Sequence, residues 1–190
     1  MRHDAKRWLA ALAAALGLLS ATPAAAEGLE PEEAAQLINE VRQRIAGCGE
    51  MLRANAQRGT APSALPGRPP LAWSPRLAAA AEDHSRAMAE QAFFDHVDRE
   101  GRRVAQRADA AGYRWRSIGE NLAAGHRTLD DALRGWLRSE GHCRNLLDER
   151  FTDFGLARVV SQRPNDRYRV YWTLVLGRPA APVVRTASTD

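Results

Sequence analysis

The sequence predicts an α+β domain in which helices cover both faces of a small, mostly antiparallel β-sheet. Several segments repeat apolar residues at the spacing of an amphipathic helix, and others show the alternating or continuous apolar pattern of strands. Their order along the chain is helix, helix, helix, strand, helix, strand, strand. A single sheet with helices on both sides would bury all of these apolar faces.

The first two helices are predicted over 31–47 and 75–92. Pro31 suits the first position of a helix, and Ser74 before Pro75 provides an N-cap hydroxyl. The apolar stripe of the second helix includes His84, which we therefore interpret as a core histidine rather than as a ligand.

Two more helices are predicted over 102–111 and 128–139. Gly112 ends the first of these, and Thr128 with Asp131 forms a capping-box-like start for the second. The buried face of the second helix includes Trp136.

Strands are predicted over 118–123, 154–160 and 170–176. The last is apolar on both faces, which indicates a strand that is covered on both sides. The Pro- and Gly-rich stretch 58–70 is expected to be a surface loop, and residues 179–190 a flexible tail.

Residues 1–26 have the features of a cleavable signal peptide. A mostly basic start is followed by the uncharged run Trp8–Ala26, which ends in small residues at Ala24-Ala25-Ala26. An uncleaved anchor is the alternative, but the run is short, rich in Ala and broken by Pro23. We therefore predict one domain over 27–178, secreted or periplasmic, with no membrane span after cleavage.

The charge of the chain does not indicate a nucleic-acid partner. The net charge is +4, and it falls to +2 when the leader, with three basic residues and one acid, is removed. Arginine and acidic residues are interspersed rather than gathered on a basic face.

Cys48 and Cys143 are the two cysteines of the chain. In an exported protein such a pair is expected to form a disulfide, which would fix the backbone beside His142. Two buried thiols are the alternative, and two cysteines are too few for a four-cysteine zinc site.

Glu120 is the most informative polar residue. Its neighbours on the same strand face are Ile118 and Leu122, so a carboxylate is carried into an apolar layer or a cleft, where it must be paired, hydrogen-bonded or metal-bound. A structural Glu that accepts backbone N–H groups is the alternative. His96 and His142 are expected on loops next to helices, and with Glu120 they would form a zinc set with an open position.

An ordered series of motifs supports a family assignment. It consists of Leu71-Ala72-Trp73, His84-Ser85, Phe94-Asp95-His96, Gly119-Glu120-Asn121-Leu122-Ala123, Trp136-Leu137-Arg138-Ser139-Glu140-Gly141-His142, Cys143-Arg144-Asn145, Phe151 to Gly155 and Tyr171-Trp172 to Gly177. From about Ile38 to Gly177 the chain resembles the CAP superfamily (cysteine-rich secretory, antigen 5 and pathogenesis-related proteins) in its bacterial SCP-like form.

The resemblance implies a three-layer α-β-α sandwich whose cleft carries two His and two Glu and holds zinc in some members. By motif, His96 and His142 match the two His, and Glu120 matches the first acid. Ser139 stands where the second acid is usual. Glu140, one residue further on, would turn inward and could substitute for that acid if the helix persists past Ser139. Cys48 and Cys143 also resemble the cysteine pair of many bacterial members.

Three functions fit these residues. The first is a non-enzymatic binding module for a small apolar or cell-wall ligand or a protein partner, with Zn²⁺ as the one implied cofactor. The second is a metal-assisted hydrolase in which Glu120 acts as general base. The third is a structural envelope protein with a vestigial cleft. Family resemblance alone does not name a reaction.

Overall fold

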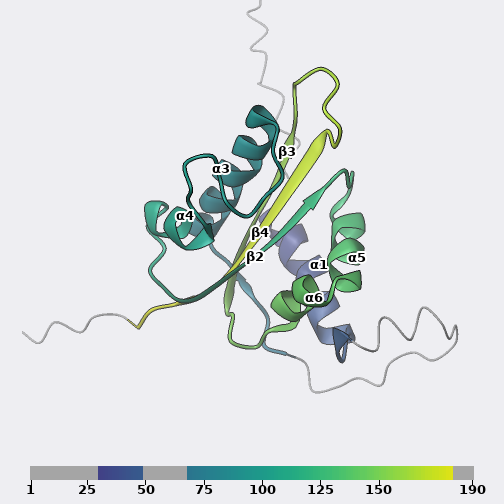
Figure 1. The fold of residues 1–190 in the computed structure, drawn as a ribbon. Coiled ribbons are helices and arrows are strands. Elements are labelled where there is room, and N and C mark those ends of the chain that lie inside the picture. Colours follow the sequence, from purple (N-terminus) through teal and green to yellow (C-terminus); the bar gives the residue numbers. More distant parts are fainter. Residues whose placement is uncertain (1–29, 49–67, 182–190) are drawn as a thin grey trace, which may run out of the picture.

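Helices lie on both faces of a four-stranded sheet in the computed structural model, which describes residues 30–48 and 68–181 (Figure 1). The predicted signal peptide, most of the 58–70 loop and the last residues of the predicted tail lie outside the described residues. The elements are α1 Pro31–Arg44, β1 Ala72–Trp73, α3 Pro75–Gln91, α4 Val104–Ala110, β2 Trp115–Ala124, α5 Leu129–Arg138, α6 Glu140–Leu147, β3 Asp153–Val160 and β4 Val170–Pro179.

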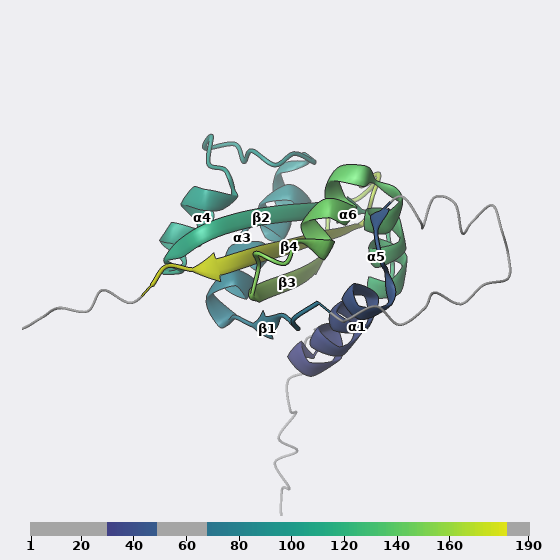
Figure 2. The same ribbon diagram turned by 90° about the horizontal axis from the view of Figure 1, so that it is seen from below.

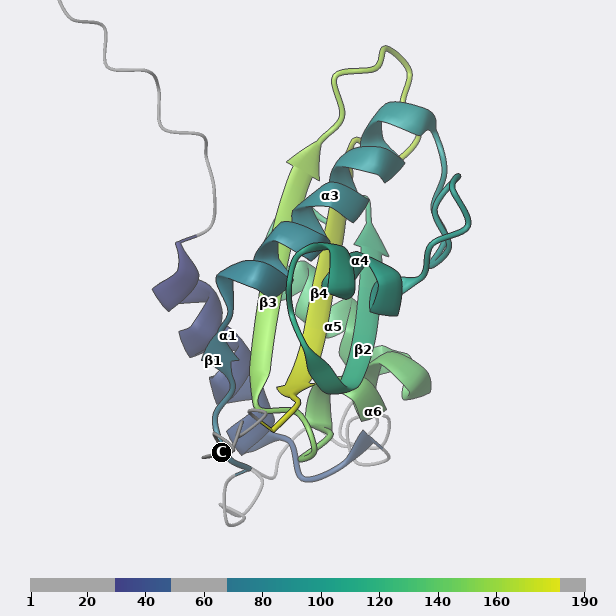
Figure 3. The same ribbon diagram turned by 90° about the vertical axis from the view of Figure 1, so that its left-hand side faces the viewer.

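The sheet has the strand order β1-β3-β4-β2. Strand β4 pairs antiparallel with β2 and with β3, whereas the short β1 runs parallel to β3. Helices α3 and α4 cover one face, and α1, α5 and α6 cover the other (Figures 2 and 3). The predicted α+β class and the three-layer arrangement with a mostly antiparallel sheet are therefore confirmed.

The core has one part on each face of the sheet. The larger cluster lies between the sheet and α1, α5 and α6, and includes Trp136, Phe154 and Trp172. Two smaller clusters lie under α3 and α4, around Leu77 and Met88. Because β4 is central, all of its residues from 170 to 177 are buried, as its apolar pattern predicts.

Two predicted helix starts are confirmed by their caps. The Ser74 hydroxyl accepts a hydrogen bond from the backbone N–H of Leu77 at the start of α3. The Thr128 hydroxyl accepts one from the N–H of Asp131 at the start of α5. These local bonds satisfy N–H groups that have no partner within the helix.

Several boundaries differ from the prediction. Helix α1 ends at Arg44 rather than near residue 47, and α4 begins at Val104. The sequence patterns missed β1, which is two residues long and has no periodicity to detect. They also missed α6, because the chain leaves the helical conformation at Ser139 and enters a second short helix directly afterwards.

Two close contacts hold neighbouring elements together. The predicted disulfide is present: Cys48 and Cys143 are bonded with their Cα atoms 5.8 Å apart, which ties the segment after α1 to α6. On the other face, α3 lies so close to β3 that a Cβ at Gly155 would stand 2.0 Å from a backbone nitrogen of α3.

In the part of the chain that the structure describes, none of the helices combines the length and the apolar character that crossing a membrane requires.

Candidate functional site

The candidate site lies along β2, an edge strand whose side chains alternate between the two faces of the sheet. Ile118 and Leu122 point toward the α3 and α4 layer, as the alternation predicts, and Glu120 stands between them. Asn121 points the other way, and its amide donates to the backbone carbonyl of His142 in α6. Strand β2 thus contacts both helical layers within two consecutive residues.

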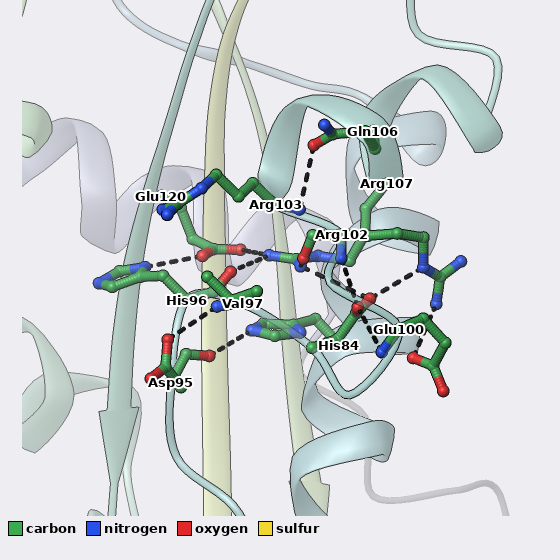
Figure 4. Close-up of polar contacts among 11 residues, drawn as sticks. His84, Asp95, His96, Val97, Glu100, Arg102, Arg103, Gln106, Arg107 and Glu120 are labelled. Atoms are coloured by element: carbon green, nitrogen blue, oxygen red, sulfur yellow. Dashed lines mark hydrogen bonds and ion pairs between the residues drawn. The ribbon is translucent and has the colours of Figure 1, made fainter.

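Both carboxylate oxygens of Glu120 have a charged or polar partner (Figure 4). Its Oε1 lies 2.8 Å from Nδ1 of His96, and its Oε2 accepts a hydrogen bond of 2.6 Å from Nη2 of Arg107. The Glu120 side chain is 3% exposed and that of Arg107 is 2% exposed, so the ion pair is removed from water. The sequence-based requirement that this carboxylate be paired is met by side chains rather than by backbone N–H groups.

Sequence reasoning missed Arg107. It lies in α4, and its guanidinium also donates to the backbone carbonyls of Arg102, at 2.6 Å, and His96, at 3.2 Å. The available signal was its position in the predicted 102–111 helix: it falls three residues after Val104, on the buried face. A cation on an apolar helix face requires a buried anion, and Glu120 is that anion.

Asp98 braces the loop that carries His96. It accepts hydrogen bonds from the backbone N–H of Glu100 and of Arg102, and from Nε of Arg102 at 2.9 Å. Its Oδ2 also lies 3.8 Å from Nη1 of Arg107. Burial opposes ionisation of Asp98, but the N–H and guanidinium groups around it lower its pKa below the ordinary value. Arg107 therefore faces two buried carboxylates.

His96 and His142 are brought together across the edge of β2, with their ring centroids 6.4 Å apart. His142 lies in α6 rather than on the predicted loop, next to the disulfide-bonded Cys143. The His96 side chain is 50% exposed and His142 is half-buried, so a ligand can reach the pair. The hydrogen bond with Glu120 raises the pKa of His96, whereas burial and the nearby His96 lower the pKa of His142.

Ser139, at the position of the usual second acid, and Glu140, expected to turn inward if the helix continued, lie at the junction of α5 and α6. Ser139 has φ −100° and ψ 121°, which ends α5 and makes this residue the N-cap of α6. The helix does not persist, so the prediction that Glu140 turns inward is wrong: its side chain is 68% exposed and pairs with Arg144. Among the described residues, the Ser139 hydroxyl makes no hydrogen bond to either imidazole.

The other two histidines within the described residues, His84 and His126, lie apart from this pair. His84 is fully buried in α3, as predicted, with Nε2 2.9 Å from the backbone carbonyl of Asp95. Burial lowers the pKa of His84 below its ordinary value of 6.5. His126 is only partly exposed, because its ring lies against Gly135 of α5.

The donor set fits a zinc ion only in part. No group of three or more His, Cys, Asp or Glu residues within 30–48 and 68–181 is placed to hold a metal. Glu120 is not placed as a direct ligand in this arrangement, because its side chain is 3% exposed and its oxygens face Arg107 and His96. It is instead placed as the carboxylate that orients a ligating imidazole, which leaves Nε2 of His96 and the ring of His142 as two donors. A catalytic zinc site normally has three protein ligands.

The sequence of the whole domain identifies the family. The family model described as the cysteine-rich secretory protein family, CAP, matches residues 35–176. This α-β-α domain with a His-Glu-His edge site therefore belongs to the CAP family, as the motif resemblance predicts.

Individual relatives support this assignment. The uncharacterized protein YkwD of Bacillus subtilis is 30% identical over 95 residues, which are 50% of this chain and 37% of YkwD. The uncharacterized membrane protein YlbC of the same organism is 33% identical over 86 residues, 45% of this chain and 25% of YlbC. The chain thus covers well under half the length of these curated relatives.

Solved structures show the same fold. An extracellular protein containing an SCP domain from Bacillus anthracis superposes with a TM-score of 0.53 at 26% identity, over 79% of this chain and 44% of that one. An outer surface protein from Borrelia burgdorferi superposes with a TM-score of 0.56 at 17% identity, over 80% of this chain and 98% of that one. At that identity the second likeness concerns the fold alone.

Proposed function

We propose that this CAP domain is a non-enzymatic binding module that acts outside the cytoplasm and contacts its ligand through His96 and His142 at the edge of β2. One observation carries the proposal: both oxygens of Glu120 are occupied by N–H donors of the protein itself. Glu120 therefore supports the imidazole pair, and the imidazoles are the groups that face solvent.

The same observation disfavours the hydrolase. A general base must lie within about 2.6–3.2 Å of the water or hydroxyl that it deprotonates. The Glu120 side chain is 3% exposed, and its oxygens contact a buried guanidinium and an imidazole. Exposing the carboxylate to a substrate would separate it from its buried cation, which is costly.

The pair suits a ligand that presents oxygen acceptors, such as a carboxylate or phosphate of a cell-wall component or of a partner protein. Imidazole N–H groups are donors to such oxygens. The rings are held in place from behind: Glu120 contacts His96, and the Asn121 amide holds the backbone of His142. A site whose groups are fixed before binding loses less conformational entropy when the ligand arrives.

Zinc at the pair is part of the same proposal. Nε2 of His96 and the ring of His142 would supply two protein ligands, with Glu120 orienting the first. The remaining positions would be open to an oxygen of the ligand. Titrating Zn²⁺ into metal-free protein tests this: the heat of binding should disappear in the His96→Ala, His142→Ala double variant. An unchanged heat in that variant would place the ion elsewhere.

Export is supported by three observations. The first 26 residues have a signal-peptide pattern, the domain contains a disulfide, and a related SCP-domain protein is extracellular. We propose a secreted or periplasmic location. The intact mass of protein recovered from the culture medium or periplasm should correspond to a chain that begins at Glu27. Recovery from the cytoplasm with the leader still attached would contradict this.

Co-sedimentation with purified peptidoglycan sacculi tests the ligand. The wild-type domain should pellet with the sacculi, and a smaller fraction of His96→Ala and of His142→Ala should pellet. His126→Ala is the matched control, because its ring packs against Gly135 away from the pair, and it should pellet like the wild type. Equal pelleting of all variants would refute a role for the pair. Muropeptide turnover that vanishes in a folded Glu120→Gln variant would instead support the hydrolase.

A further inference from the structure

A second hollow of the molecule is lined by aromatic rings. It lies between the C-terminal end of α3 and the loop that joins β3 to β4, and its volume is about 390 Å³. These two segments lie at the same end of the molecule (Figure 3). Small-molecule sites in proteins commonly measure about 300–1,000 Å³. Phe93, Phe94, Tyr168 and Tyr171 line it, together with Arg163, Asn165, Asp166 and Arg167. Ala92 is the only aliphatic residue of this lining.

The loop that forms one wall is held rigidly by a buried carboxylate. Asp166 accepts hydrogen bonds from the backbone N–H of Tyr168, at 2.8 Å, and of Arg169, at 2.9 Å. Its oxygens also accept from the Tyr171 hydroxyl and pair with Arg163. These bonds fix the β3–β4 loop before any ligand binds.

The same loop is tied to α3. The Ser161 hydroxyl and Nε of Arg163 both donate to the backbone carbonyl of Ala89, at 3.1 and 2.7 Å. The two walls of the hollow, one from the end of α3 and the other from the β3–β4 loop, therefore keep a fixed separation.

Positive φ angles are concentrated around this hollow. Among the described residues, the non-glycine positions with positive φ are Ala92 at 58°, Asn165 at 62° and Arg169 at 65°. Ala92 and Asn165 line the hollow, and Arg169 directly follows Tyr168. Asn adopts this conformation readily, and at Ala92 it ends helix α3, so the bends at these positions set the path of the chain around the hollow.

The exposed groups at the hollow are aromatic faces and guanidinium groups. Phe94 is 43% exposed, and its ring centroid lies 5.6 Å from that of Tyr168. The Arg167 guanidinium stands 5.3 Å from the Tyr168 centroid, and that of Arg99 stands 5.1 Å from the Phe93 centroid. Within the described part of the chain, neither Arg99 nor Arg167 forms an ion pair, whereas Arg163 is neutralised by Asp166.

We propose that this aromatic hollow binds a saccharide unit that carries a carboxylate. The C–H faces of a pyranose ring can pack on the exposed Phe94 ring, the Asn165 amide can bond to ring hydroxyls, and the unpaired Arg167 guanidinium complements the carboxylate. A lipid chain is disfavoured because Arg163, Asp166 and Arg167 bring charged groups into the lining. The site does not depend on the His96–His142 pair.

The proposal is tested by titrating the full exported domain with simple sugars. Binding is measured by NMR chemical shifts and by calorimetry. The probes are two acidic sugars, N-acetylmuramic acid and glucuronic acid, and their neutral counterparts, N-acetylglucosamine and glucose. We expect saturable shifts of Tyr168 and Asn165 with the acidic sugars and at least several-fold weaker binding of the neutral ones.

Phe94→Ala should weaken binding of the acidic sugar by roughly fivefold to tenfold, as the loss of one aromatic contact implies. Arg167→Ala should abolish the preference for acidic over neutral sugars. Trp115→Ala is the matched control, because Trp115 is a similarly exposed aromatic residue on β2, and it should bind like the wild type.

Absence of saturable shifts with all four sugars would overturn the proposal. Equal affinity for acidic and neutral sugars, or unchanged affinity in Phe94→Ala, would also overturn it. Because these probes are monosaccharides read at the hollow, failure here is distinct from failure of the sacculus test for the histidine pair.

Discussion

Replacing Arg107 by Met removes the cation that faces two buried carboxylates. In the wild type its guanidinium bonds to Glu120 and lies 3.8 Å from Asp98, and the side chains of these two acids are 3% and 1% exposed. Methionine fills similar space but leaves Glu120 with His96 as its partner. Removing one member of a buried ion pair typically costs about 3–5 kcal/mol. Domains of this size are commonly stable by about 5–15 kcal/mol, so this loss should be large yet measurable.

Urea denaturation of the disulfide-bonded protein at pH 7 is the appropriate assay. The buried Trp136 and Trp172 report the transition by fluorescence. The midpoint should fall while the slope of the free energy against urea concentration stays constant, which indicates a change in stability rather than in the unfolded state.

Two further variants distinguish the cost of breaking the buried ion pair from the cost of losing any positive charge. Arg102→Met removes a cation that is 46% exposed and contacts the same Asp98, and it should cost less than about 1 kcal/mol. The double variant Arg107→Met, Glu120→Gln should recover part of the loss, because no unpaired charge remains at the Glu120 position. A cost below about 1 kcal/mol for Arg107→Met would refute our interpretation of Glu120 as an anion held by a buried cation.

Three more perturbations test the fold. Gly155→Ala should destabilise the protein by at least about 1–3 kcal/mol, because the new Cβ would lie 2.0 Å from the backbone of α3. Gly141→Ala is the control, because a Cβ there would have nothing within 4 Å. Equal melting temperatures of the two variants would contradict the close packing at Gly155. Replacing Cys48 and Cys143 by Ser opens a loop with a sequence separation of 95 residues. The chain-entropy model gives a loss of about 4–5 kcal/mol in urea denaturation, and a negligible loss would count against the cross-link. Burial lowers the pKa of His84 below 6.5, so the unfolded chain binds this proton first. Stability should therefore fall as pH drops below about 6.5, by at most about 1.4 kcal/mol per pH unit for this group. His84→Gln should reduce that slope, and an unchanged slope would exclude His84 as its source.

The candidate site contains contacts that could be predicted from the sequence and contacts that could not. The alternation along β2 correctly places Glu120 in a buried layer, but the sequence contains no local sign that its partner is Arg107, thirteen positions earlier. The motif match correctly pairs His96 with His142, because a resemblance over the whole domain carries information about distant contacts. The motif match could not predict the direction of the Glu140 side chain, because the non-helical conformation of Ser139 changes the orientation of the residues that follow it.

The sequence by itself determined the layers and all of the described elements except β1 and α6. Apolar spacing, N-cap hydroxyls and the fully apolar 170–176 segment depend on residues within a turn or a strand of one another, so local chemistry specifies them. Only the tertiary structure decided which charge neutralises Glu120, where Glu140 points and which aromatic rings share a hollow. Those contacts join separate elements, and their geometry is set by strand register and loop path, which short-range patterns in the chain do not encode.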